Sequence, residues 1–151
     1  MIECIDHVNL VVDDLQQMVV FYRDLLGLRL TKQASISGQW IEALTGFEKV
    51  QADVAYLEAS NGAGIELIQY RTPEGSRPAG LGAPNTKGIR HVALRVAELD
   101  MLVASLRLAN VDVLSDVQQV SAAQVEYADQ RKRIVYCRDP EGNLLELCIF
   151  Q

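Results

Sequence analysis

The segment Ile5-Asp6-His7-Val8-Asn9-Leu10-Val11-Val12-Asp13-Asp14-Leu15 occurs twice in this chain. It returns 84 residues later as Ile89-Arg90-His91-Val92-Ala93-Leu94-Arg95-Val96-Ala97-Glu98-Leu99, with six of the eleven positions identical. The chain has only two histidines, His7 and His91, and both occupy the same place in this repeat. A histidine that only packs in a core has no reason to recur with its surroundings, whereas a pair of metal ligands related by a pseudo-twofold axis does.

The later parts of the two halves repeat as well, at a slightly shorter spacing. Tyr56, Gly62, Glu66 and Leu67 lie 80 residues before Tyr136, Gly142, Glu146 and Leu147. A duplicated β-α-β-β-β unit with a small length change in its middle explains both spacings. We therefore expect two tandem modules within one structural domain, residues 1–70 and 89–151. Residues 71–88 join them as a linker, since this segment holds three of the four prolines and lacks apolar periodicity.

The apolar periodicity within each module predicts its strands and helices. In the first module we expect strands at 4–12, 28–31, 54–57 and 65–70, a helix over 15–26, and a loop at 35–38 followed by helical turns at 40–46. In the second we expect strands at 89–96, 111–114, 134–137 and 144–150 and a helix over 99–106, with a type I turn at 139–142; residues 118–132 fit no pattern. Trp40, the only tryptophan, is expected to be a lid or core anchor, or otherwise one wall of a substrate pocket.

Composition and charge exclude several classes of protein. The net charge of −6 and the pI of about 4.9 argue against a nucleic-acid partner, since an acidic chain repels phosphate backbones. No apolar run is long enough to span a membrane, and the N-terminus does not resemble a signal peptide. Cys4, Cys137 and Cys148 lie in apolar, strand-like runs, which indicates buried free thiols in a reducing compartment. We therefore expect a cytoplasmic protein.

Four polar residues recur at matched strand positions: His7, Glu66, His91 and Glu146. Both glutamates lie among apolar neighbours, and burying a carboxylate is costly unless it is paired or bound to a metal. The alternative is that strand alternation points both glutamates at water. Two imidazoles and two carboxylates suit a divalent metal ion with open positions, which leaves Zn, Ni, Co, Mn and Fe(II) as candidates. The lack of a cysteine ligand argues against a closed structural zinc site.

The repeated modules resemble the vicinal oxygen chelate superfamily, also called the glyoxalase / bleomycin resistance / extradiol dioxygenase superfamily. The resemblance rests on the β-α-β-β-β duplication, the Asp-His-Val opening, the segment Phe21-Tyr22-Arg23-Asp24-Leu25-Leu26-Gly27-Leu28 and the closing segment 138–147. It implies an α+β fold in which both modules form a curved eight-stranded mixed sheet around a metal cleft. The metal-ligand positions of the family fall on His7, Glu66, His91 and Glu146, as in bacterial glyoxalase I, and all four hold competent ligands.

The resemblance also implies the chemistry. A metal-dependent lyase or isomerase of the glyoxalase type chelates two adjacent oxygens of a small substrate and stabilises an enediolate or enolate during proton transfer, with Glu66 or Glu146 as the base. The alternatives are an epimerase of the methylmalonyl-CoA type, an extradiol-type dioxygenase, or a non-catalytic antibiotic- or toxin-binding protein. Asn9 and Arg95 share the ligand face of their strands by alternation, where they either contact substrate or only face solvent. The long linker resembles that of epimerase-like members, in which one chain builds each site, and we expect a homodimer because open sheet edges tend to be covered.

Overall fold

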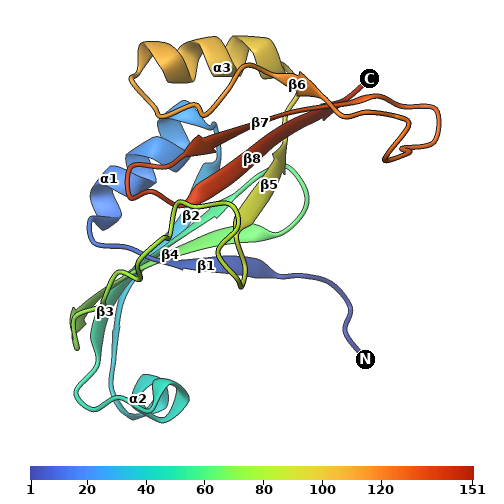
Figure 1. Cartoon of the computed structure of the whole chain (residues 1–151). Coiled ribbons are helices and arrows are strands. Elements are labelled where there is room, and N and C mark those ends of the chain that lie inside the picture. Colours follow the sequence, from blue (N-terminus) through green and yellow to red (C-terminus); the bar gives the residue numbers. More distant parts are fainter. The chain divides into compact units, whose positions relative to one another are not determined.

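The computed structural model describes all 151 residues, and the chain divides into two compact units, Met1–Arg77 and Pro78–Gln151. Each unit contains one four-stranded mixed sheet with few helices, as expected for an α+β fold (Figure 1). The boundary between the units falls inside segment 71–88. Residues 78–88 of this segment belong to the second unit. They are bound to it through Gly82, whose carbonyl oxygen accepts hydrogen bonds from Arg138 Nε and Nη2 at 3.2 and 3.1 Å.

The first unit runs β1 (His7–Val11), α1 (Leu15–Val20), η1 (Phe21–Leu25), β2 (Arg29–Ser37), α2 (Gln39–Thr45), β3 (Gln51–Glu58) and β4 (Gly64–Thr72). Its strand order is β1-β4-β3-β2, with β1 parallel to β4 and the other pairs antiparallel. Helix α1 packs on β3 and β4. One face of the sheet therefore lies against α1, and the other face is left for the polar residues of β1.

Helix α1 begins where the sequence predicts, because the side chain of Asp14 accepts a hydrogen bond from the backbone of Gln17 at 2.9 Å. The expected single helix over 15–26 changes after Val20 into the π-helical turn η1. Met18, Val19 and both aromatic residues of this turn, Phe21 and Tyr22, are buried. The apolar residues that repeat along this helical segment therefore form the side that covers the sheet.

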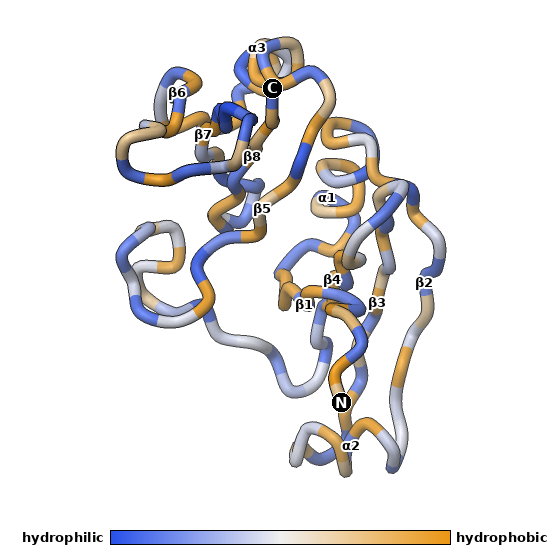
Figure 2. The backbone as a smooth tube through the Cα atoms, turned by 90° about the vertical axis from the view of Figure 1, so that its right-hand side faces the viewer, coloured by the Kyte–Doolittle hydropathy of each residue, from blue (hydrophilic) through white to orange (hydrophobic).

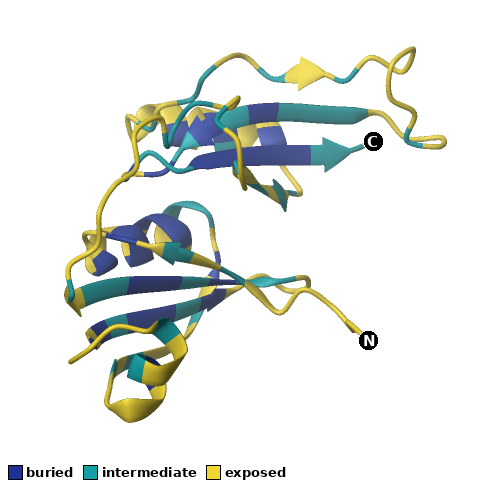
Figure 3. Ribbon diagram, turned by 60° about the horizontal axis from the view of Figure 1, so that its bottom comes forward, coloured by how far each residue is buried: buried dark blue, intermediate teal, exposed yellow.

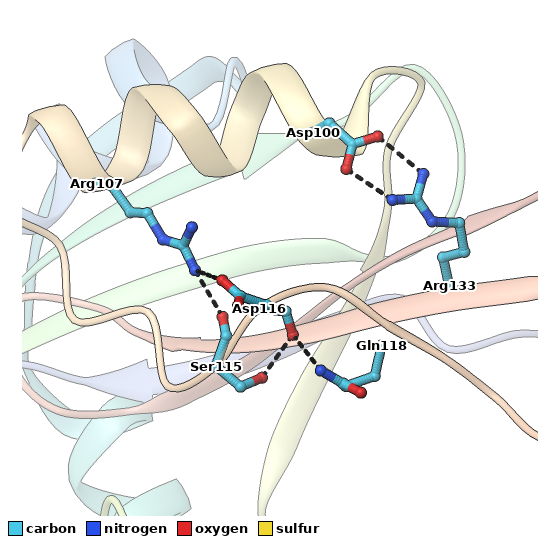
Figure 4. Close-up of polar contacts among 6 residues, drawn as sticks. All are labelled: Asp100, Arg107, Ser115, Asp116, Gln118 and Arg133. Carbon is cyan, nitrogen blue, oxygen red and sulfur yellow. Dashed lines mark hydrogen bonds and ion pairs between the residues drawn. The ribbon is translucent and has the colours of Figure 1, made fainter.

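The second unit runs β5 (His91–Arg95), α3 (Leu99–Leu108), β6 (Gln118–Gln119), β7 (Lys132–Arg138) and β8 (Leu144–Phe150), in the strand order β5-β8-β7-β6. Strand β5 is parallel to β8, which repeats the pairing of β1 with β4. Leu99, Val103 and Leu106 form the buried side of α3. Ion pairs hold both ends of this helix, from Asp100 to Arg133 at 2.7 Å and from Arg107 to Asp116 at 2.8 Å (Figure 4).

Three of the expected elements differ in the structure. The predicted strand at 111–114 is reduced to one bridge between Val113 and Cys137, and the fourth strand of the sheet is instead the two-residue β6, which is exposed at the edge (Figure 3). The predicted loop at 35–38 is mostly strand, because β2 continues to Ser37. Ser35 there donates to Asp53 of β3 at 2.6 Å, which compensates for the weak strand propensity of the segment. Strand β1 is also shorter than predicted.

Two predictions of burial were wrong, while others are confirmed. Cys4 is exposed because it precedes β1, whereas Cys137 and Cys148 are buried free thiols, as expected. Trp40 is not a core anchor, since it is 58% exposed and Ile41 is the buried residue of α2. The hydropathy pattern in Figure 2 shows polar and apolar positions alternating along β2, in agreement with a strand that has one face turned outward. No helix is long and apolar enough to cross a bilayer.

The turn between β7 and β8 holds the strand that carries Glu146. The predicted turn is confirmed by the hydrogen bond from the Gly142 backbone to the Asp139 carbonyl at 3.0 Å. The Asp139 side chain is buried and accepts three more hydrogen bonds, from the backbone of Glu141 and from the backbone and side chain of Asn143, at 2.8–3.0 Å.

Replacing Asp139 with Ala is therefore expected to destabilise the protein by about 2–3 kcal/mol, because one buried and two half-buried donors lose their acceptor. Urea denaturation followed by circular dichroism measures the change. Asp116→Ala is the matched control, since the Asp116 side chain is 87% exposed and its ion pair is worth at most about 1 kcal/mol. Equal losses in the two variants would contradict a structural role for the turn.

Candidate metal centre

The first unit brings His7 and Glu66 together through the pairing of β1 with β4. Alternation places His7, Asn9 and Val11 on the face of β1 that is turned away from the core. The parallel register sets Asn9 opposite Glu66, so that His7 lies one step before Glu66 on the same face. His7 Nε2 is consequently 3.4 Å from Glu66 Oε2.

The second unit repeats this arrangement. Strand β5 places His91, Ala93 and Arg95 on one face, and the parallel register with β8 sets Ala93 opposite Glu146. His91 Nε2 lies 3.6 Å from Glu146 Oε2. Glu146 is buried, with 5% of the residue exposed, so the alternative that it points to water is wrong for this residue.

Polar neighbours orient the pair in the first unit. His7 Nδ1 lies 2.7 Å from Asp6 Oδ2, and this hydrogen bond raises the pKa of His7 while leaving Nε2 on the side of Glu66. A carboxylate on the far ring nitrogen is the usual way in which a metal-binding histidine is held. Glu66 accepts a hydrogen bond from Asn9 Nδ2 at 2.6 Å. Its hydrogen bond with the Tyr56 hydroxyl, together with burial, raises the pKa of Tyr56 to about 12.

The pair in the second unit has a charged neighbour instead. Lys132 Nζ lies 2.6 Å from Glu146 Oε1, and this ion pair raises the pKa of Lys132. The His91 ring packs against Tyr136 with centroids 5.4 Å apart. Arg90 occupies the position that corresponds to Asp6, and its guanidinium donates to a backbone carbonyl at 3.1 Å.

Lys132 was not predicted as a site residue because it closes the segment 118–132, which shows no periodicity. A usable signal was nevertheless present. Lys132, Ile134 and Tyr136 alternate along β7, and the register of β7 with β8 sets Tyr136 opposite Glu146. Lys132 therefore had to share the face of Glu146.

The donors fit a divalent metal ion. Two donors that bind one ion tetrahedrally, with bonds of about 2.1 Å, lie roughly 3.4 Å apart. The nitrogen–oxygen separations of 3.4 and 3.6 Å are close to this value. Within neither unit do three or more His, Cys, Asp or Glu side chains gather around one point, so each unit supplies one imidazole and one carboxylate. The structure thus brings His7 to Glu66 and His91 to Glu146.

A cavity of about 610 Å³ lies elsewhere in the first unit. It is lined by the N-terminal residues of α1 and by polar side chains of β2, β3 and β4, among them Ser35, Asp53, Gln69 and Arg71. These positions alternate with Glu66 and Tyr56, so they belong to the helix-covered face of the sheet. The cavity is separate from the His7–Glu66 pair, and we assign it no part in the chemistry.

Comparison with known proteins finds relatives that are similar over almost the whole chain. In amino-acid sequence, the chain is 29% identical to 2-epi-5-epi-valiolone epimerase from Actinomyces sp. over 147 residues, which span 95% of this chain and 77% of that protein. Among solved structures, a glyoxalase family protein from Bacillus cereus superposes with a TM-score of 0.84 at 26% identity, covering 99% of this chain and 95% of the other. Glyoxalase I from Leishmania major shares the fold, with a TM-score of 0.62 at 16% identity over 96% of this chain and 85% of the other.

The family model of the Glyoxalase/Bleomycin resistance protein/Dioxygenase superfamily matches residues 4–147, from before the first His–Glu pair to just beyond Glu146. With nearly the whole length matched and both modules included, the chain belongs to this superfamily.

Proposed function

We propose that the chain is a divalent-metal-dependent enzyme of the glyoxalase type, in which His7, Glu66, His91 and Glu146 bind one Zn, Ni, Co, Mn or Fe(II) ion. The observation that carries the proposal is the recurrence of one His–Glu pair at the same register of the same strand pair in both units. A site for one ion needs more donors than either pair offers alone, and the two pairs together supply four. The metal would act as a Lewis acid for negative charge that develops on the oxygens of a small substrate.

The side chains around the pairs have distinct tasks in this proposal. Asp6 would hold the proton on Nδ1 of His7, so that Nε2 would present its lone pair to the ion. Asn9 and Tyr56 hold the Glu66 carboxylate through neutral hydrogen bonds. Lys132 compensates the charge of Glu146, which is otherwise costly to bury.

Proton transfer at a carbon next to a carbonyl requires a base beside the ion. Glu66 and Glu146 are the two carboxylates of the proposed site, and either would accept the proton from the substrate carbon. The hydrogen-bond partners of the two carboxylates differ, since Asn9 donates to Glu66 and the Lys132 ammonium group donates to Glu146. Substituting each glutamate separately identifies which one is the base.

A second candidate, an epimerase, uses the same proton transfer with return of the proton to the opposite face of the carbon. It is favoured by the Actinomyces relative, which is named as an epimerase and is similar over almost the whole chain. The buried free thiols Cys137 and Cys148 are compatible with a reducing compartment, and we propose the cytoplasm.

Replacing either glutamate with Gln tests the enzymatic role. Gln keeps an oxygen near the metal but cannot accept a proton, so at the base position we expect kcat to fall by about 10²–10⁴-fold while KM changes little. The assay measures kcat, KM and metal occupancy on the same samples, with methylglyoxal–glutathione, methylmalonyl-CoA and 2-epi-5-epi-valiolone as trial substrates.

Glu58→Gln is the control for this pair of variants. Glu58 lies on β3 in an ion pair with Arg29, outside the two His–Glu pairs, and its loss should leave kcat unchanged. If Glu66→Gln and Glu146→Gln both retain metal and full kcat, neither glutamate is the base. A protein that purifies without metal and only binds its ligand would be a sequestering protein instead.

We also propose that the chain is a homodimer in which each metal site comes from one subunit. His7→Ala and His91→Ala variants, unfolded and refolded together, distinguish this arrangement from a shared site. If each site lies within one chain, the mixture regains no high-affinity metal binding, because every chain lacks one ligand. If sites are shared, mixed dimers regain one intact site, and recovery of up to a quarter of the wild-type metal content would refute the proposal. Sedimentation of the wild type verifies the dimer.

A further inference from the structure

Two cations, Arg95 and Lys132, lie on the ligand face of the second unit, and the chemistry described above gives Arg95 no task and Lys132 only that of pairing with Glu146. Arg95 follows His91 by four residues on β5, and Phe150 follows Glu146 by four residues on β8, so both share the face of the His–Glu pair. Lys132 lies directly opposite Phe150 in the β7–β8 register. The three side chains therefore lie on one face, beside His91 and Glu146.

Both cations approach the same aromatic ring. The Arg95 guanidinium carbon lies 5.0 Å from the centre of the Phe150 ring, and Lys132 Nζ lies 5.7 Å from it. Lys132 is in addition 5.7 Å from the ring of Tyr127, with 15% of its side chain exposed. The ammonium group thus lies between two aromatic rings and the Glu146 carboxylate.

The charges in this group do not balance. Glu146 is the only carboxylate paired with either cation, through Lys132 at 2.6 Å. Arg95 is exposed and makes neither a hydrogen bond nor an ion pair with an acidic group. A cation–π contact at an exposed site is weak, and two like charges near one ring repel each other. The face consequently carries an excess positive charge in a chain whose net charge is −6.

The first unit lacks both cations at the corresponding positions. The positions that correspond to Arg95, Lys132 and Phe150 in the first unit hold Val11, Ala52 and Tyr70. There the same face carries an apolar cluster, with Ala52, Val54 and Ile68 buried against Ala34, Ile36, Tyr56 and Tyr70. Its cation is Lys32, which lies opposite Tyr56 in the β2–β3 register and 5.6 Å from the Tyr56 ring. The two units therefore offer the same His–Glu pair but different surroundings, and two cations at one aromatic ring are specific to the second unit.

We propose that Arg95 and Lys132 form a subsite for a carboxylate or phosphate group of the substrate. The guanidinium fork donates to two oxygens of such a group, and the ammonium group adds a point charge. The Phe150 ring supplies an apolar surface for the carbon that bears the anion. The inference rests on the proposed function, since it takes the face of the His91–Glu146 pair to be the substrate face. It restricts the substrate class to small molecules that carry an anionic group near their metal-binding oxygens.

The test uses the metal-free protein, so that neither the metal nor turnover affects the result. Amide and arginine side-chain NMR signals are recorded during titration with inorganic phosphate and, separately, with acetate, at constant ionic strength set by chloride. We expect saturable shifts at Arg95 Nε and at the Phe150 amide. The anion that saturates at the lower concentration identifies the phosphate or the carboxylate as the natural group.

Matched variants complete the test. Arg95→Gln should weaken binding by at least about tenfold, as expected for the loss of a charge-assisted hydrogen bond. Lys132→Met should do the same, and it is paired with a Lys132→Met, Glu146→Gln double variant that leaves no uncompensated buried charge. Arg133→Gln is the control, since Arg133 neighbours Lys132 on β7 but points to the opposite face, toward Asp100; it should bind as the wild type does.

Absence of saturable shifts in the wild type, or unchanged binding in Arg95→Gln, would overturn the subsite. If Lys132→Met loses binding and the double variant keeps it, Lys132 serves Glu146 alone and the two-cation subsite is wrong. None of these outcomes touches the proposed proton transfer. Conversely, unchanged kcat in Glu66→Gln and Glu146→Gln would refute the proposed function without affecting the anion-binding measurement.

Discussion

Parallel pairing of the first and last strands of each unit is the constraint on which the candidate site depends. In the registers of β1 with β4 and of β5 with β8, the residue opposite each glutamate lies two positions after the histidine of the neighbouring strand. The histidine and the glutamate therefore lie on the same face. A slip of one residue would move Glu66 or Glu146 to the face covered by a helix and would leave its charge unpaired. The helices enforce the register, because α1 and α3 need the apolar residues of the opposite face for their own burial.

The two units keep the same pair and differ in what surrounds it. Neutral groups hold Glu66, whereas Lys132 holds Glu146 at 2.6 Å. The face around Glu66 combines an apolar cluster with a single cation, Lys32, beside Tyr56, whereas the face around Glu146 carries both Arg95 and Lys132 at one ring. In the function proposed for this chain, the difference would let one carboxylate act as the base while the surroundings of the other bind the substrate.

Much of this was predictable from the sequence, for an identifiable reason. The His and Glu residues recur with their neighbours, so the repeat alone indicated the strands and their matched faces. Lys132 was not predictable in the same way, because it closes a polar segment with no periodicity. The length of β2 was also missed, since Ser35 and Ser37 look like loop residues and are stabilised by cross-strand partners such as Asp53. Exposure of Trp40 depends on the packing of α2, which a single aromatic residue does not reveal.

X-ray absorption spectroscopy of the zinc-loaded protein distinguishes one metal ion shared by both His–Glu pairs from separate ions at each pair. We predict one zinc ion per chain, with two imidazole nitrogens and two carboxylate oxygens at about 2.0–2.2 Å and any further ligand from solvent. Two zinc ions per chain, each with a single imidazole, would contradict the shared site, and so would a protein that retains no zinc after gel filtration.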